Sequence, residues 1–320
     1  MTQFIDPKTL SRVKDLPLVA KTLAHGFLQG LHDSRQRGVG IEFSQYRVYE
    51  PGDELSKIDW KLFARSDRYF VREAERESEI NVWFVLDCSE SMLQANSQHA
   101  NKSNKKSRRS TSQDSNEASE ERVWSKLKYS QYLIATMAYL AQKQGDSVGL
   151  LALSSGKSQF TPAYAGERHW QKLLIELTKI QPNGTFPEVE QVKRQLSSLR
   201  KNGLIILLSD FHQQHDEISQ LAINLANDRT EVISFHLSSH DEIDFPFTGA
   251  IRFEDLETKE QRLVSAEQVK DDYLAERQAY NDQLKSKLIQ HRVQYVPTNI
   301  DQPLNDTLFT FLNARKKVIR

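Results

Sequence analysis

The 320-residue sequence lacks several features that would place it in a familiar class of protein. Its single cysteine, Cys88, excludes an internal disulfide and is typical of a reducing compartment. No segment approaches the roughly 20 apolar residues that a membrane-spanning helix requires. The first residues also show no charged-then-apolar leader pattern. We therefore expect a cytoplasmic protein without membrane insertion.

The chain has no excess of charge of either sign. Its 43 basic and 43 acidic side chains give a formal net charge of zero. Without a global positive field, a protein gains little attraction to the polyanionic backbone of DNA or RNA. Nucleic acid is therefore not expected among the partners.

Two short patterns imitate nucleotide or metal motifs but are incomplete. Gly156-Lys-Ser resembles the end of a phosphate-binding loop, but the glycine expected five residues earlier is replaced by Leu151. His212 and His215 have no cysteine or third histidine at zinc-ligand spacing. An intrinsic nucleotide site and a zinc site are therefore not expected.

From Asn81 onward, apolar runs alternate with amphipathic segments. The run from Gly203 to Leu208 is apolar throughout, as a strand covered on both faces should be. Such alternation predicts a doubly wound α/β domain with a mostly parallel sheet. A β-hairpin at 245–264 is expected at the sheet edge. The predicted strands are 81–87, 147–153, 204–209, 231–237 and 292–296, and the predicted helices are 122–143, 167–179, 187–200, 215–227, 266–290 and 302–315. In the long helix 266–290, Tyr273, Tyr280, Leu284 and Leu288 are expected to face the sheet.

The residues before this domain differ from it in composition and in hydrophobic pattern. Residues 1–80 are predicted to form an N-terminal helix and β-ribbon extension to an α/β domain spanning 81–320. Within the latter, residues 94–120 are rich in Ser, Asn, Gln, Lys and Glu and contain almost no residue that could build a core. This composition is typical of a disordered loop insertion. The alternative is an arm that captures a partner.

Three polar segments are expected to meet at the carboxyl edge of the sheet. Asp87, Ser89 and Ser91 follow a buried apolar run, Thr185 lies in a later loop, and Asp210 follows the apolar run that ends at residue 208. Ligands of open α/β sheets bind at this edge. Carboxylate and hydroxyl oxygens suit a hard cation such as Mg²⁺, which also keeps exchangeable waters. A carboxylate from another protein could replace one of these waters. The pattern therefore predicts a metal-dependent binding site rather than a catalytic one.

Longer stretches of sequence carry a resemblance to a known family. They are Gly40-Ile-Glu-Phe43, Tyr49-Glu-Pro-Gly-Asp53, Ile58-Asp-Trp-Lys61, Ala64-Arg65, Val71-Arg72, Asp87-Cys-Ser-Glu-Ser-Met92, Gln144-Gly-Asp-Ser-Val-Gly-Leu-Leu-Ala152, Leu207-Leu-Ser-Asp-Phe211 and Phe245-Pro-Phe-Thr-Gly249. With them the chain resembles the von Willebrand factor A-like fold with its metal-ion-dependent adhesion site. More closely, it resembles the bacterial family catalogued as domain of unknown function 58, over roughly residues 31–296.

The resemblance implies a metal site, formed by Asp87, Ser89, Ser91, Thr185 and Asp210, for Mg²⁺ or Mn²⁺. In the family pattern the two serines and either Thr185 or Asp210 bind the ion, while Asp87 holds water ligands and orients the serines.

The resemblance also implies partners. These are a MoxR-type AAA+ ATPase and a client protein, with the chain acting as an adaptor in chaperone-like remodelling or maturation. The segment 38–80 is then either a docking surface for the ATPase or a ribbon that packs on the α/β domain.

Two other functions stay open. One is a magnesium-dependent phosphatase or phosphotransferase with Asp87 as nucleophile, as in haloacid-dehalogenase-like enzymes. Those enzymes normally have a second acid two residues later, where this chain has Ser89, a poor general acid near neutral pH. The other is a structural adaptor without metal. Magnesium-dependent protection against thermal unfolding would separate it from a metal-binding protein, because a ligand of the folded state stabilises that state.

Overall fold

The computed structural model describes residues 16–24, 46–48, 63, 65, 69–72, 80–95, 124–155, 158–199, 203–213, 215–256, 259–309 and 311. The chain divides into two compact units, one formed by Met1–Phe27 with Ile80–Arg320 and the other by Leu28–Glu79. This division groups residues 1–27 with the α/β part, whereas the sequence pattern grouped them with the rest of 1–80. Most of the predicted loop insertion 94–120 lies outside the described residues, as do most of the predicted N-terminal helix and ribbon.

The first unit is built on a six-stranded sheet with the strand order β10-β7-β6-β3-β4-β5. The chain starts in the middle of the sheet at β3, adds β4 and β5 on one side, and then adds β6, β7 and β10 on the other. Only β5 runs antiparallel to its neighbour. This is the predicted doubly wound, mostly parallel α/β fold. The strands are β3 (Asn81–Asp87), β4 (Ser147–Leu153), β5 (Gln159–Tyr164), β6 (Gly203–Ser209), β7 (Thr230–Ser238) and β10 (Val293–Asn299).

The three central strands are buried along nearly their whole length. Their continuous apolar runs suit strands that are covered on both faces. The register of the sheet pairs Leu86 of β3 with Leu208 of β6, and Asp87 with Leu153 of β4. The three strands therefore end at the same level, which brings the residues after them to one edge of the sheet.

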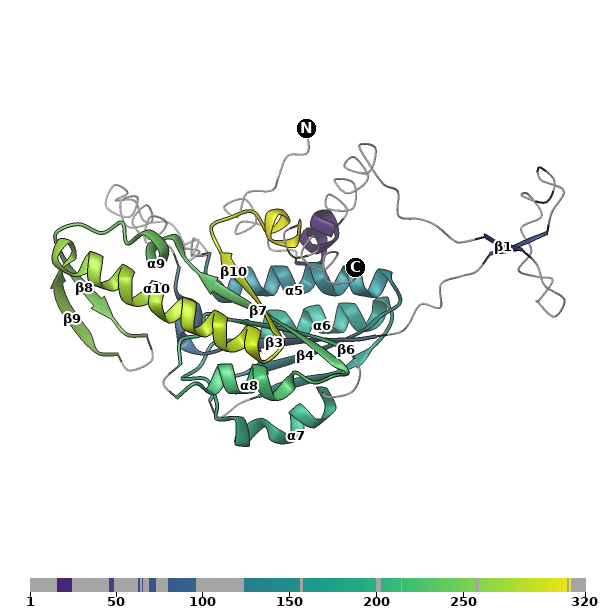
Figure 1. Ribbon diagram of the computed structural model, residues 1–320, viewed down its shortest axis with the longest axis horizontal. Coiled ribbons are helices and arrows are strands. Elements are labelled where there is room, and N and C mark those ends of the chain that lie inside the picture. The colour runs from purple at the N-terminus through teal and green to yellow at the C-terminus, as the bar shows by residue number, and fades with distance from the viewer. Residues whose placement is uncertain are drawn as a thin grey trace, which may run out of the picture. The chain divides into compact units, whose positions relative to one another are not determined.

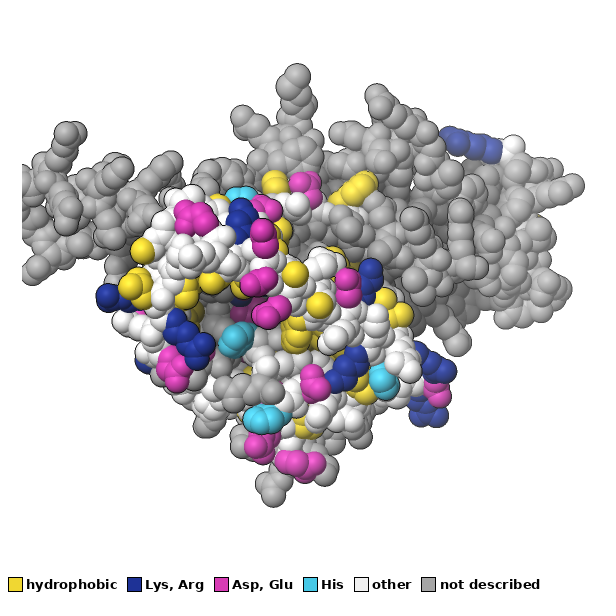
Figure 2. Space-filling model, turned by 60° about the vertical axis from the view of Figure 1, so that its left-hand side comes forward, with side chains coloured by type: hydrophobic (Ala, Val, Ile, Leu, Met, Phe, Trp, Pro, Cys, Tyr) yellow, Lys and Arg dark blue, Asp and Glu magenta, His cyan; other side chains and the backbone are white. Residues whose placement is uncertain are grey.

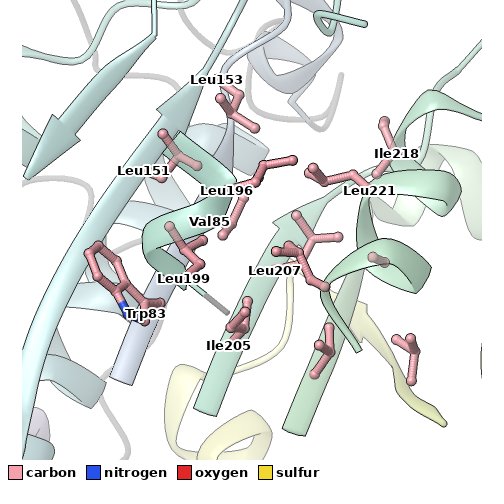
Figure 3. Packing of buried hydrophobic residues seen from close by; sticks show 14 of the residues in the cluster. Trp83, Val85, Leu151, Leu153, Leu196, Leu199, Ile205, Leu207, Ile218 and Leu221 are labelled. Atoms are coloured by element: carbon pink, nitrogen blue, oxygen red, sulfur yellow. The ribbon is translucent and has the colours of Figure 1, made fainter. Parts of the chain in front are cut away.

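Helices cover both faces of the sheet (Figure 1). On one face lie α5 (Lys126–Lys143) and α6 (Glu167–Lys179), and on the other lie α7 (Val189–Leu199), α8 (Glu217–Leu225) and part of α10 (Ala266–Gln290). Figure 3 shows the second layer, in which side chains of β3, β4 and β6 meet those of α7 and α8. Each buried aliphatic side chain there stabilises the fold by about 1.5–3 kcal/mol. The labelled members of this core are Trp83, Val85, Leu151, Leu153, Leu196, Leu199, Ile205, Leu207, Ile218 and Leu221.

Helix α10 faces the core through fewer residues than its spacing predicted. Leu284 and Leu288 are buried as expected, but Tyr273 is only half-buried and Tyr280 is 38% exposed. The hydroxyl of Tyr280 donates a hydrogen bond to the carbonyl oxygen of Phe211. The tyrosine is therefore a rim residue, because its polar end needs a partner at the edge of the core.

The predicted hairpin exists, but it is not part of the main sheet. Strands β8 (Ala250–Glu254) and β9 (Gln261–Ser265) pair only with each other, in a separate antiparallel sheet. Lys259, between them, forms an ion pair of 2.7 Å with Glu90, just after β3. The expectation of a hairpin on the sheet edge was therefore wrong, since the hairpin instead contacts the loop at the carboxyl edge.

Short elements complete the described chain. The sequence pattern did not predict β5, the 3₁₀ helix η2 (Glu90–Leu93) or α9 (His240–Asp244). In the second unit, β1 (Tyr46–Val48) and β2 (Phe70–Arg72) form an antiparallel pair, as a ribbon would. Residues 16–24 and 304–309 are helical. Within the described part of the chain, no helix combines the length and the apolar character needed to cross a bilayer.

Candidate metal centre

The candidate site lies where the direction of winding reverses. Strand β3 is hydrogen-bonded to β4 on one side and to β6 on the other, and the chain proceeds outward from this central position in both directions. Loops that leave such neighbouring strands move apart and leave a crevice at their carboxyl ends, where open α/β sheets bind ligands. Asp87 is the last residue of β3, and Asp210 directly follows β6.

The loop after β3 is organised by the carboxylate of Asp87. Its Oδ1 accepts hydrogen bonds from the backbone N–H of Ser89 at 2.9 Å and from Ser89 Oγ at 2.7 Å. An aspartate that binds the backbone two residues later forms a local turn. The turn leads into η2, and Ser91 Oγ lies 3.0 Å from Ser89 Oγ.

The loop after β6 completes the arrangement. Asp210 Oδ1 accepts a hydrogen bond of 3.2 Å from Ser91 Oγ. Ser209 Oγ donates to Asp87 Oδ2 at 2.6 Å and accepts from the backbone N–H of Phe211 at 2.9 Å. Four of the five predicted residues thus form one hydrogen-bonded line from Asp87 through Ser89 and Ser91 to Asp210. Ser209, which the sequence places beside Asp210 at this edge but which is not among the five predicted ligands, joins this line.

Thr185, the fifth predicted residue, is near this line but outside it. Its loop is held against the loop after β3 by two backbone hydrogen bonds, from Asn183 N to Cys88 O at 2.9 Å and from Glu90 N to Gly184 O at 2.8 Å. The residue itself is exposed. Its backbone N–H donates to Ser155 Oγ at 3.2 Å. Main-chain hydrogen bonds therefore hold this loop beside the loop after β3.

The site carries an excess of buried negative charge. Burial, followed by the nearby charge of Asp210, raises the pKa of Asp87 to about 7, against the opposing effect of the hydrogen bonds from Ser209 and Ser89. Two carboxylates that approach each other away from water disfavour each other's ionisation. A cation between them would remove this repulsion.

A buried lysine accompanies Asp210, and the sequence pattern had not indicated it. Lys126 Nζ lies 2.9 Å from Asp210 Oδ2, 2.8 Å from Glu242 Oε1 and 2.9 Å from Gln94 Oε1. The lysine side chain is 1% exposed. Burial acts to lower the pKa of Lys126, but the two carboxylates outweigh burial and hold the pKa above its ordinary value. Burial also acts to raise the pKa of Asp210 and of Glu242, and the lysine charge holds both below their ordinary range.

Two sequence signals could have indicated this group. Lys126 is the first residue of α5, where the helix dipole disfavours a positive charge, so a lysine at this position needs another reason. Ser239 and Glu242 form a capping box at the start of α9, which the Ser-x-x-Glu spacing shows. Neither signal reveals that α5 and α9 meet at Asp210.

The oxygen atoms fit a hard cation. Mg²⁺ binds six ligands at about 2.0–2.1 Å, so neighbouring ligands of an octahedron lie about 2.9 Å apart. The spacing between Ser89 Oγ and Ser91 Oγ is 3.0 Å, and that between Ser91 Oγ and Asp210 Oδ1 is 3.2 Å. Within the part of the chain that the structure describes, no three His, Cys, Asp or Glu side chains gather as a metal site would need. A cation at this edge would therefore depend on the serine hydroxyls.

A polar cavity lies beside the lysine group, at the ends of β7 and β10. Its volume is about 380 Å³, and its lining includes His236, Ser238, Arg277 and Tyr295. His236 Nδ1 is 2.6 Å from the hydroxyl of Tyr295. Burial, followed by the charge of Arg277, lowers the pKa of His236 to about 4. Figure 2 brings the left-hand side of Figure 1 forward, and on the described part of that face acidic and basic side chains are interspersed.

Comparisons with known proteins place the chain among uncharacterized relatives. The family described as "Protein of unknown function DUF58" matches residues 45–108 and 109–283. The uncharacterized protein Mb1516 of Mycobacterium bovis is 23% identical over 257 residues, which cover 79% of this chain and 72% of that protein.

Two solved structures with a similar fold are BatB, a conserved hypothetical protein, and the VWA domain of SpRpn10. BatB of Bacteroides thetaiotaomicron is 13% identical with a TM-score of 0.40, covering 73% of this chain and 99% of that one. The VWA domain of SpRpn10 is 12% identical with a TM-score of 0.36, covering 72% of this chain and 93% of that one. Similarities of this size do not say what the chain binds.

Proposed function

The chain belongs to the family of proteins of unknown function DUF58, and from this premise we propose that it is a non-enzymatic, metal-dependent protein-interaction module. One observation carries the proposal. Asp87, Ser89, Ser91 and Asp210 meet at the switch point of the sheet in one hydrogen-bonded line, and the oxygens of Ser89, Ser91 and Asp210 have the spacing of octahedral ligands.

The residues have distinct roles in this proposal. Ser89, Ser91 and Asp210 would hold Mg²⁺ or Mn²⁺, and Asp87 would orient the serines through the hydrogen bond that Ser89 donates to it. The loop of Thr185 is hydrogen-bonded to the loop after β3, and in this proposal a movement of the loop would let Thr185 supply a further oxygen ligand. When bound, the ion would accept a carboxylate oxygen from an Asp or Glu of the partner in place of a water.

The position of Asp87 supports binding rather than catalysis. Its side chain is fully buried, and both of its carboxylate oxygens accept hydrogen bonds, from Ser89 and from Ser209. A nucleophile for phosphoryl transfer must be reached by the phosphorus in line with the leaving group, and a fully buried carboxylate is not accessible in this way. We therefore rank the phosphatase or phosphotransferase alternative below a binding function.

The resemblance of the motifs supports a particular class of partner. We propose that the chain acts as an adaptor between a MoxR-type AAA+ ATPase and a client protein in remodelling or maturation. The carboxylate that completes the metal's coordination would come from one of these two proteins.

The Lys126 group favours a second candidate, an adaptor that needs no metal. Its ammonium already neutralises part of the charge of Asp210. The two candidates differ in one measurable respect. A metal-dependent module gains thermal stability from Mg²⁺ or Mn²⁺ because the ion binds the folded state, whereas a metal-free adaptor does not.

A pull-down in the presence of Mg²⁺ or EDTA tests the proposal. Wild-type tagged protein should retain its AAA+ partner in Mg²⁺ and lose it in EDTA, and Ser89→Ala should lose it in both. Thr136→Ala is the control, because Thr136 is buried in the middle of α5 and its hydroxyl donates a hydrogen bond to the carbonyl oxygen of Tyr132. Equal capture by the wild type and Ser89→Ala, with and without EDTA, would contradict a metal-dependent module.

A further inference from the structure

The strongest interaction beside the candidate centre is made by Lys126. A buried ammonium is costly unless it is fully paired, and this one has a partner for each of its three N–H donors: Asp210, Glu242 and Gln94. The carboxylate of Asp210 is also almost completely buried, with 2% of its side chain exposed. The pair is therefore screened very little by solvent.

Asp210 is shared between two different environments. Its Oδ2 faces Lys126, while its Oδ1 accepts hydrogen bonds from Ser91 Oγ and from the backbone N–H of His212 at 3.1 Å. A cation held by the serine hydroxyls and Oδ1 would therefore share one carboxylate with the ammonium. Two positive charges on opposite oxygens of a single carboxylate repel each other, and in a buried site the repulsion is strong.

We propose that Lys126 is a tethered competitor of the metal ion, which lowers the affinity of the site for a divalent cation. The inference rests on the proposed function, which it deepens. The ammonium neutralises part of the charge that Asp210 would otherwise give to the ion. The bound ion therefore keeps more of its positive charge and binds an external carboxylate more strongly. Lys126 makes the site weak toward the ion alone and selective for an acidic partner.

A purely structural role for the lysine predicts the opposite result. If Lys126 only held Asp210 in place for the ion, removing the ammonium would misplace a ligand, and the cation would bind more weakly. The sign of the change in affinity therefore separates a competitor from a support.

The single variant Lys126→Met is not sufficient. It leaves the carboxylates of Asp210 and Glu242 buried without their cation, so it can fail to fold, and the added negative charge would attract any cation. The double variant Lys126→Met/Glu242→Gln removes one positive and one negative charge, which keeps the total charge of the group unchanged. The control is Lys143→Met, the same substitution at the exposed far end of α5.

Calorimetric titration with Mn²⁺ alone provides the test, with circular dichroism to confirm folding. The double variant should bind Mn²⁺ roughly tenfold more tightly than the wild type, or more, because a nearby buried positive charge has been removed. Lys143→Met should bind as the wild type does. Binding by the double variant when the wild type binds no Mn²⁺ would support the competition but contradict the proposed metal-dependent module, because the ammonium would then exclude the ion from the native protein.

Other outcomes overturn the inference. If the wild type binds Mn²⁺ and the folded double variant binds with equal or lower affinity, Lys126 is not a competitor, and the proposed metal-dependent module still stands. If no protein binds Mn²⁺, both the inference and the proposed function fail.

Discussion

Ser91 Oγ donates a hydrogen bond of 3.2 Å to Asp210 Oδ1, although the two residues are 119 positions apart in the sequence. The register of β3 and β6 makes this contact possible, because it ends both strands at the same level. The contact joins the two loops into one row of oxygen atoms. The candidate centre is therefore a property of the sheet topology as much as of the individual residues.

Ser91→Ala is expected to remove the response of the protein to a metal ion. Without metal, the loss of the two hydrogen bonds of the Ser91 hydroxyl, to Ser89 and Asp210, should lower the free energy of unfolding by about 2 kcal/mol. Excess Mg²⁺ at about 100 times its dissociation constant should add about 2.7 kcal/mol to the wild type. The variant should gain much less, because it lacks a ligand. Urea unfolding with and without Mg²⁺ measures both quantities.

The control for this prediction is Thr136→Ala, which removes a buried hydroxyl that donates a hydrogen bond of 2.8 Å to the carbonyl oxygen of Tyr132 within α5. It should lose about 1 kcal/mol of stability and keep the full increment from Mg²⁺. A Ser91→Ala protein that gains as much from Mg²⁺ as the wild type would show that the hydroxyl is not a ligand.

Gly184→Ala should displace the loop that carries Thr185. Gly184 has a φ of +58°, and a Cβ atom there would lie 2.2 Å from Ser155 Oγ. The strained backbone should cost about 1–3 kcal/mol, and the clash should disturb the hydrogen bond between Glu90 N and Gly184 O. If the loop contributes a ligand, the stabilisation by Mg²⁺ should also decrease. Thermal unfolding with and without Mg²⁺ checks both effects.

The control variant Gly166→Ala separates the effect of backbone strain from the effect of displacing the loop that carries Thr185. Gly166 also has a positive φ, of +100°, but nothing lies within 4 Å of the Cβ position. The control variant should lose stability through the backbone alone and respond to Mg²⁺ as the wild type does. A normal Mg²⁺ response in Gly184→Ala as well would exclude the loop from the metal site.

The buried central strands could be predicted closely from the sequence. Strands β3 and β4 and helices α6 and α10 begin and end at the predicted residues. Continuous apolar runs leave little choice of register or length when both faces are covered. Strand β5 was missed because it lies at the sheet edge, where it is mostly half-buried or exposed and contains a proline, so that it has no apolar run.

The candidate site could be predicted only in part. Asp87 and Asp210 follow apolar strands directly, so their place at the carboxyl edge can be read from the sequence. The contact of Lys126 with Asp210 and Glu242 could not be predicted. It depends on where the first turns of α5 and α9 lie relative to that edge, which is a matter of tertiary packing. Thr185 illustrates the same limit: its loop is hydrogen-bonded to the loop after β3, but the sequence could not show that the residue itself is exposed.

Wild-type protein should show no phosphatase activity that depends on Asp87. Asp87 is fully buried and is held by hydrogen bonds from Ser89 and Ser209, so a phosphate ester has no open path to its carboxylate. Hydrolysis of p-nitrophenyl phosphate with Mg²⁺ should be equal for the wild type and Asp87→Asn, both at background. Turnover by the wild type that disappears in Asp87→Asn would instead favour the phosphotransferase alternative.

His236 should make the protein less stable at acidic pH. Its pKa is lowered from 6.5 to about 4, mainly by burial and then by the charge of Arg277. Between these values the unfolded chain binds a proton that the folded protein does not. The contribution of His236 to the free energy of unfolding is therefore fully present above pH 6.5. It is lost as the pH falls toward 4, and the loss is roughly 3 kcal/mol for this shift in pKa.

The variant His236→Gln isolates this contribution. Glutamine is neutral at every pH and can still bond to the Tyr295 hydroxyl, which lies 2.6 Å from the histidine ring. Asp210 and Glu242 also have lowered pKa values, so both proteins should lose stability in acid, and only the difference between them reports on the histidine. The wild type should lose more stability than the variant from pH 7 to pH 4, as measured by urea unfolding. Parallel profiles for the two proteins would mean that the ring gains its proton without unfolding, and that the neighbouring cavity admits water to it.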